Sequence, residues 1–259
     1  RIKMRQCIFC LEKANSLEDA FPHWITDQFK ASMPCKAQLE RQGSVNTWHV
    51  DQPELSIRCV CKSCNNGWMS DLESQTKKYL QPLLMGEKCV LDFSSQTTIA
   101  LWSLKTAMVL EALDQQQQRI YTQQEREQLQ KLSIIPWRTS VWLATSIDRS
   151  LFLSAKNRHM SAEDTSKISG ASITMAFSHV VIQVFTIRVP PEVGPSTCVT
   201  ANVRCGPWEQ ATIQIWPAKT TPVMWPPQLA LNSEAGLDAL AERFSTTVLG
   251  ENEVESLIV

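Results

Sequence analysis

Two pairs of cysteines near the start of the chain have the spacing of metal-binding knuckles. Cys7-x-x-Cys10 and Cys61-x-x-Cys64 each place two residues between the sulfur-bearing positions. Each pair can offer two thiolates to one tetrahedral ion, and two pairs complete the four-sulfur shell that holds structural zinc in reducing compartments. The spacing therefore predicts one structural Zn2+ bound by Cys7, Cys10, Cys61 and Cys64.

The other cysteines do not extend this pattern. The chain has nine cysteines, an odd number, and seven of them lie before residue 90, whereas a secreted disulfide framework would spread an even number along the chain. A thiol redox protein would need one knuckle to be a reactive pair, and the presence of two knuckles argues against it. Cys59 is close enough to Cys61 to replace it as a ligand. We expect the rest to be small core or loop residues, because free cysteine is often buried: Cys35, Cys89, Cys198 and Cys205.

The composition is that of a soluble globular chain. Of the 259 residues, 43% are hydrophobic and 20% are charged, and the net charge is −1. This charge argues against a surface that coats nucleic acid everywhere, although residues 1–90 carry a small positive excess. No apolar run approaches the roughly 20 residues of a membrane-spanning helix, and the first residues lack the apolar core of a signal peptide. We therefore expect a cytoplasmic protein with no membrane partner.

The first 90 residues are expected to form a module around the knuckles. Aromatic and aliphatic residues at helical spacing predict a helix over residues 21–31, whereas residues 32–56 look irregular. Residues 65–67, Asn-Asn-Gly, predict a turn. Ser70-x-x-Glu73 has the capping-box pattern and predicts a helix that begins at Ser70 and runs to about residue 84.

Beyond residue 90 the chain begins with helices and turns to strand periodicity near Arg138. Residues 97–113 are almost continuously apolar and predict a buried helix, and the capping box at residues 122–125 opens a helix to about residue 131. Residues 234–244 return to helical spacing. Segments rich in β-branched and aromatic residues predict an antiparallel sheet from residues 140–147, 151–154, 172–176, 180–188 and 211–216. The expected fold class is α+β, with a zinc module over residues 1–90 and a helical and α+β region over residues 91–259.

Two further expectations concern packing. We expect Trp24, Trp68 and Trp102 to pack the zinc module onto the helix of residues 97–113 rather than to stack on bases, because each ring buries a large area. Lys105 interrupts that apolar helix. It could meet a phosphate, but the default expectation is that its stem follows the apolar surface while its ammonium reaches water.

Three stretches within residues 7–73 also carry a family resemblance. They are Cys7-x-x-Cys10, Glu18-Asp19-Ala20-Phe21-Pro22-His23-Trp24-Ile25 and Cys61-x-x-Cys64-Asn65-Asn66-Gly67-Trp68-Met69-Ser70-x-Leu72-Glu73. The order and the residue types of these stretches resemble those of the bacterial HNH-endonuclease-like proteins. Residues 101–107, 215–217 and 225–227 look like later segments of the same family. The resemblance implies a zinc-stapled ββα-metal finger, followed by helices and a carboxy-terminal antiparallel-sheet region, and a hydrolase that cleaves nucleic acid.

The resemblance also implies roles for individual residues. In that family an acidic residue and the residue after the last knuckle cysteine hold a catalytic divalent ion such as Mg2+, while a histidine activates water. Glu18 and Asn65 fall at the two ligand positions, and Asp19 stands where the histidine is expected. An aspartate is normally ionised at neutral pH, so Asp19 suits a cation better than proton abstraction. The family's intermediate Asn is also missing from residues 55–58.

The replacement at Asp19 leaves alternatives open. His23 lies four residues later and could supply the imidazole from the same helical face, or it could be a plain surface residue. Whether Asp19 is natural or an introduced replacement is not fixed by the sequence. Asp19, Glu18, Asn65 and His23 are the candidate catalytic residues.

Two functions of different classes follow. The first is an HNH-like, metal-dependent endonuclease that acts on nucleic acid, on DNA more than on RNA. The second is a catalytically silent, zinc-stabilised module that binds nucleic acid or a protein. Neither indicates an oligomeric state. Basic residues around the finger could line a nucleic acid backbone, although a solvated surface of mixed charge accounts for them equally well: Arg1, Lys3, Arg5, Lys13, Arg58, Lys62, Lys77 and Lys78.

Overall fold

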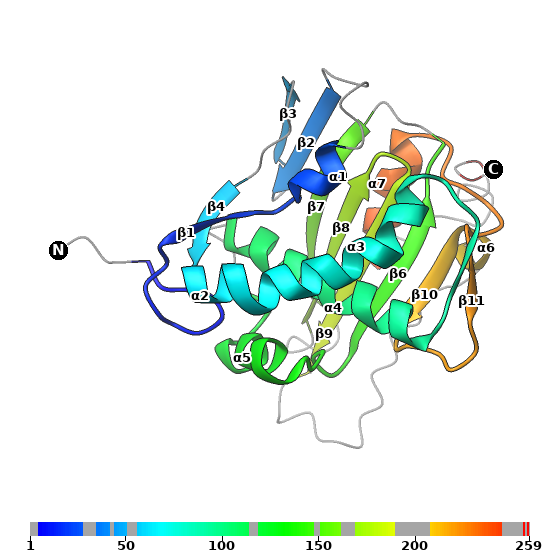
Figure 1. Ribbon diagram of the computed structural model, residues 1–259. Helices are drawn as coiled ribbons and strands as arrows, with labels where there is room; N and C mark the ends of the chain where they lie inside the picture. The colour runs from blue at the N-terminus through cyan, green and yellow to red at the C-terminus, as the bar shows by residue number, and fades with distance from the viewer. Residues whose placement is uncertain are drawn as a thin grey trace.

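A seven-stranded sheet with helices on both faces runs through the molecule (Figure 1). The computed structural model describes residues 5–27, 35–41, 44–50, 56–113, 119–147, 151–161, 169–189, 208–244, 256 and 258. The strands are β2 (Cys35–Arg41), β3 (Ser44–Val50), β6 (Thr139–Thr145), β7 (Leu151–Ser161), β8 (Ser169–Phe177), β9 (Val180–Arg188) and β10 (Thr212–Trp216). Their order across the sheet is β10-β6-β9-β8-β7-β2-β3. The predicted combination of helices and sheet is confirmed.

The strands beyond residue 138 pair antiparallel, as predicted. β9 lies between β6 and β8, with Val180 opposite Thr145 on one side and opposite Phe177 on the other. Because both faces of β9 are covered, it is apolar along almost its whole length rather than alternating. β2 pairs parallel with β7, whereas the edge strand β3 pairs antiparallel with β2.

Helix α4 (Phe93–Leu113) is the buried helix that the apolar run predicts. It lies between the sheet and helix α3 (Ser70–Leu84), as Figure 1 shows. Leu104 and Met108 are fully buried, and so is Trp102, whose ring lies 5.9 Å from that of Phe177 on β8. Trp24 and Trp68 are half-buried and pack against the same core. The expected packing role of the three tryptophans is confirmed.

A second, smaller core covers the opposite face of the sheet. Short helices α6 (Trp208–Ala211) and α7 (Glu234–Glu242) contribute Trp208, Leu237 and Leu240, which pack on Val181 of β9. Successive residues of β9 therefore contribute to different cores, since side chains alternate across a strand.

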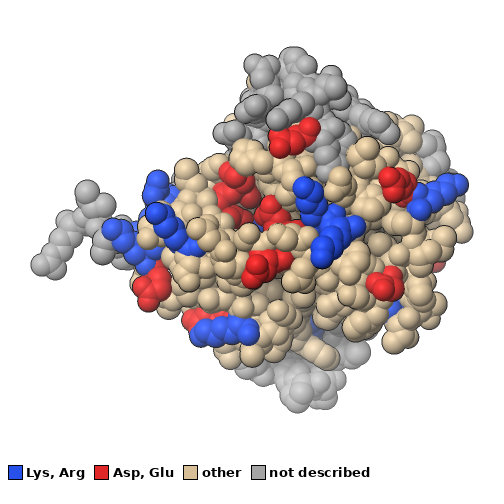
Figure 2. All heavy atoms as spheres, viewed as in Figure 1, with Lys and Arg blue, Asp and Glu red and all other residues tan. Residues whose placement is uncertain are grey.

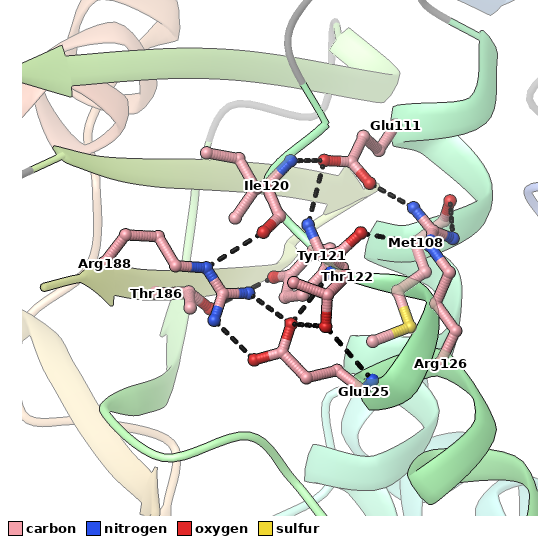
Figure 3. A network of polar contacts seen from close by, with 9 residues as sticks. All are labelled: Met108, Glu111, Ile120, Tyr121, Thr122, Glu125, Arg126, Thr186 and Arg188. Carbon is pink, nitrogen blue, oxygen red and sulfur yellow. Dashed lines mark hydrogen bonds and ion pairs between the residues drawn. The ribbon is translucent and has the colours of Figure 1, made fainter. Parts of the chain in front are cut away.

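Helix α5 (Gln123–Leu132) is tied to α4 and β9 by the polar network in Figure 3. Thr122 and Glu125 form the predicted capping box. The Arg126 guanidinium forms a buried ion pair with Glu111 of α4, and Arg188 of β9 forms a two-pronged pair with Glu125. Burial raises the pKa of Glu111 and lowers that of Arg126, because each charge has lost water.

The amino-terminal residues form a small β-ribbon followed by a helix. Strand β1 (Ser16–Asp19) pairs antiparallel with β4 (Ser56–Val60), and the chain then enters α2 (Lys62–Cys64). A π-helical turn, Asn65–Met69, continues directly into α3. The two paired strands and the helix are not consecutive in the chain, because α1, β2 and β3 lie between β1 and β4.

This helix corrects two predictions. Residues 65–67 are not a turn but part of the helical path, and Ser70 is not a helix cap, because the helix has already begun. Cys61 caps it instead: its extended backbone precedes α2, and its sulfur accepts a hydrogen bond from the Cys64 N–H. A kink at Gly67, with φ −99° and ψ −115°, accounts for the turn-like sequence.

Other boundaries differ from the expectations too. Residues 35–41 and 44–50, predicted to be irregular, form the antiparallel strand pair β2–β3. Since β2 also pairs with β7, this strand pair joins the sheet across the predicted boundary at residue 90. Helix α1 (His23–Asp27) begins two residues after the start of the helix predicted over residues 21–31, and residues 28–31 lie outside the described residues. A two-stranded sheet of β5 (Cys89–Leu91) and β11 (Val223–Trp225) was not predicted. Among the described residues, no helix is long and apolar enough to span a membrane.

Candidate metal centre and the acidic site beside it

The four knuckle cysteines come together at one place. The sulfur atoms of Cys7, Cys10, Cys61 and Cys64 all lie within 4.8 Å of one another, and the sulfurs of Cys10 and Cys61 are 3.5 Å apart. Four sulfurs that surround a zinc ion at about 2.3 Å would lie roughly 3.8 Å apart. The cluster can therefore hold a structural metal ion such as zinc, with the predicted ligand set.

Backbone contacts hold the two knuckles against each other. The Ile8 N–H of the first knuckle donates a 2.9 Å hydrogen bond to the Cys59 carbonyl of β4. In the second knuckle the Cys64 N–H points at the Cys61 sulfur at 3.4 Å, a contact that favours the thiolate form. The Phe9 and Trp68 rings meet edge to face at 4.9 Å beside the cluster.

Without a cation, burial opposes the ionisation of two of the thiols, Cys10 and Cys64. Burial raises the pKa of Cys10 to about 11 and also raises the pKa of Cys64. At Cys61 burial acts in the same direction, but hydrogen bonds from the Cys64 N–H and from neighbouring thiols outweigh it and lower the pKa. A bound metal ion supplies the missing positive charge, so metal uptake by such a site releases protons.

Cys59, the alternative ligand, lies outside the cluster. It is buried on β4, and burial, followed by the nearby charge of Glu18, raises its pKa to about 12. Cys89 is half-buried, whereas the Cys35 side chain, Cys198 and Cys205 are outside the described residues.

Glu18, on β1 beside the metal centre, forms a buried ion pair. Its side chain is 7% exposed, and its Oε1 accepts a 2.8 Å hydrogen bond from the Lys105 ammonium of α4. Lys105 is fully buried, so the expectation that its ammonium reaches water is wrong. Burying a charge without a partner is costly, and Glu18 provides the partner.

Asp19 and His23 lie together at the more exposed side of the same region. Asp19 Oδ1 accepts a hydrogen bond from the Ser56 hydroxyl of β4, and Asp19 Oδ2 is 3.2 Å from His23 Nε2. The His23 side chain is 60% exposed. Asp19 ends β1 and His23 begins α1, so the two do not share a helical face as predicted, but they still form a carboxylate–imidazole pair that faces solvent.

Asn65 connects the helix to β1 beside Glu18. Its side-chain nitrogen donates to the Leu17 carbonyl at 2.7 Å and to the Ser16 hydroxyl at 2.9 Å. The candidate positions 18, 19 and 65 are therefore neighbours, with Asn65 holding the strand that carries the two carboxylates.

Sequence reasoning did not select Glu73, which completes an acidic group. Burial raises the pKa of Glu73, the Lys105 charge acts to lower it, and the Glu18 charge acts to raise it. Figure 2 shows acidic side chains gathered between β1 and α3, with Lys and Arg side chains on either side. Glu73 belongs to the quoted motif, but nothing in its spacing signals proximity to Glu18.

The carboxylates of this acidic site do not fit the divalent ion that the family resemblance implies. Glu18 is bonded to Lys105, and Asp19 is occupied by Ser56 and His23. Within the described part of the chain, the four cysteines are the only group of three or more His, Cys, Asp or Glu side chains that is close enough to share an ion. The four-cysteine cluster fits a metal, and the carboxylates beside it do not.

The basic residues expected to surround the finger are exposed where they are described. They are Arg5, Lys13, Arg58, Lys62, Lys77 and Lys78, whereas Arg1 and Lys3 lie outside the described residues. Lys77 lies over the Trp24 ring at 5.8 Å. The chain matches no protein-family model, no curated protein and no solved structure.

Proposed function

We propose that the chain is an HNH-endonuclease-like protein whose acidic site acts on nucleic acid phosphodiesters, DNA more than RNA. The observation that supports it best is that residues 18, 19 and 65 lie together beside a four-cysteine cluster, on the β1–β4 ribbon and the helix that follows β4. These are the positions that the family resemblance assigns to its active site. The exposed basic residues around the unit are suited to a phosphate backbone.

His23 is the water-activating residue in this proposal. Asp19 orients the imidazole by holding Nε2, which leaves Nδ1 to accept a proton. A water oxygen forms a bond to phosphorus while the bond from phosphorus to the bridging oxygen breaks. The proton from the water passes to His23 Nδ1, and the leaving oxygen takes a proton from solvent. Glu18 and Asn65 position β1, on which Asp19 lies.

Nicking of supercoiled plasmid DNA tests the proposal. The zinc-loaded chain should nick the plasmid, and His23→Ala should slow nicking by about a hundredfold or more, because a general base contributes roughly 10²–10⁴. His49→Ala, an exposed histidine on β3, is the matched control and should have no effect. Asp19→Asn weakens the pair that orients the imidazole and should slow nicking as well. Nicking that is equal in the parent chain and His23→Ala would refute the role of His23.

The second candidate is a catalytically silent module that binds nucleic acid through the same surface. The ion pair of Glu18 with Lys105 favours it, because an occupied carboxylate cannot recruit a cation to stabilise a leaving group. This candidate predicts salt-sensitive DNA binding with no nicking by any of the variants above. Absence of both binding and nicking would contradict both candidates.

A further inference from the structure

Lys105 is the most unusual residue of α4. It is fully buried in a helix whose one other charged residue is Glu111, and its ammonium lies 5.8 Å from the centre of the Trp102 ring. The ammonium donates a 2.8 Å hydrogen bond to Glu18 Oε1. Lys105 also acts on Glu73, whose pKa its charge tends to lower. The Lys105 ammonium therefore lies against the buried side of the acidic site.

A divalent ion at Glu18 would have to compete with that charge. Mg2+ and Mn2+ need carboxylate oxygens at about 2.0–2.2 Å, so an ion bound to Glu18 would lie within a few ångströms of the ammonium. Two like charges at that distance repel strongly, and moving Lys105 aside would leave a buried ammonium without its counter-charge. Asp19 offers no easy alternative, since both of its oxygens already contact protein donors.

We infer that Lys105 is a built-in cation that takes the place of a divalent ion at Glu18, so that the acidic site works without Mg2+ or Mn2+. This inference rests on the position of the proposed site but not on its cleaving DNA. In this inference the Glu18–Lys105 pair has a positioning role. The pair sets the charge and the packing of the buried part of the site next to Asp19 and His23.

Mn2+ binding to the zinc-loaded protein, measured by electron paramagnetic resonance of free Mn2+, tests the inference. The parent chain should bind no Mn2+ that depends on Glu18. Lys105→Ala removes the competing charge and should bind Mn2+ at least about tenfold more tightly than the parent, because the repulsion that it relieves exceeds the energy of a tenfold change. Lys105→Ala combined with Glu18→Gln should lose that gain.

Two comparisons keep the test decisive. Lys78→Ala changes an exposed lysine on α3 and should leave Mn2+ binding at the level of the parent chain. Mn2+ binding by the parent chain that Glu18→Gln abolishes would overturn the inference, even if Lys105→Ala fails to fold. The plasmid assay reports separately on the proposed function: a chain that neither nicks nor binds DNA would refute that function and leave the Mn2+ result to be judged by itself.

Discussion

At the scale of single residues, the Glu18–Lys105 pair determines the distribution of buried charge in the acidic site. Both side chains are buried, and neither can lose its partner without leaving a charge in a poorly solvated place. The pair joins β1 to α4, so it also links the cysteine-bearing unit to the main core. The ion pair that engages the candidate metal ligand Glu18 therefore also stabilises the fold.

Lys105→Met should reduce the free energy of unfolding by about 3–5 kcal/mol, since it leaves Glu18 buried without a counter-charge. Urea unfolding of the zinc-loaded protein at pH 7 measures the loss. Lys105→Met combined with Glu18→Leu should recover a large part of it, because no buried charge remains. Lys78→Met should change the stability by less than about 0.5 kcal/mol. A loss in Lys105→Met no larger than in Lys78→Met would contradict the importance of the pair.

The residues of the site were predictable to different degrees. The four cysteines can be identified as metal ligands from the sequence alone, because the spacing within each knuckle is local and is typical of few functions besides metal binding. The partner of Lys105 does not, because Glu18 lies 87 positions away and only tertiary packing brings the two together. Without that partner, the general tendency of a lysine to reach water was the reasonable expectation, and here it is wrong.

At the scale of secondary structure elements, α5 is held by its charges as much as by its apolar face. Arg126 reaches into the core to pair with Glu111 of α4, and Glu111 also accepts hydrogen bonds from the backbone of residues 120 and 121 (Figure 3). Arg188 secures the start of the same helix through Glu125. The network fixes the path of the chain from α4 into α5.

Arg126→Met should lower the free energy of unfolding by about 3–5 kcal/mol at pH 7, because it leaves Glu111 as an unpaired buried anion. Burial already raises the pKa of Glu111 in the folded chain, and loss of the guanidinium raises it further. The deficit should therefore be largest at neutral pH and should shrink as pH falls through that pKa, since the folded state then holds Glu111 neutral. Lys131→Met, which breaks the exposed pair with Glu127, should cost less than about 1 kcal/mol. Urea unfolding from pH 4 to 8 measures both, and a deficit independent of pH would contradict this account.

The elements themselves were predictable where one strong periodic signal acts alone. The apolar run of residues 97–113 predicts the buried helix α4, and the β-branched residues 180–188 predict the strand β9. The strand pair β2–β3 was missed because Cys35–Arg41 and Ser44–Val50 are largely polar, and β2 finds its second partner in β7, more than a hundred residues later. The start of the helix after Cys61 was placed too late because the Asn-Asn-Gly sequence resembles a turn, although the helix continues through it.

At the scale of the whole molecule, the four-cysteine cluster holds together parts of the chain that the sheet does not. It fixes the first knuckle against β4 and the following helix, and β4 in turn pairs with β1. The acidic site lies at the far end of β1, and α4 anchors it to the core through Lys105. The geometry of Glu18, Asp19 and Asn65 therefore depends on the metal centre, whichever of the two candidate functions holds.

The most direct test of this account is native mass spectrometry of the purified chain and two cysteine variants. The parent chain should carry one zinc ion, Cys59→Ser should keep it, and Cys64→Ser should lose it and be less stable, because a metal that binds only the folded form contributes to folding. These results would confirm the four-cysteine centre and its ligand set. A folded parent chain without zinc, or full zinc retention in Cys64→Ser, would contradict the account.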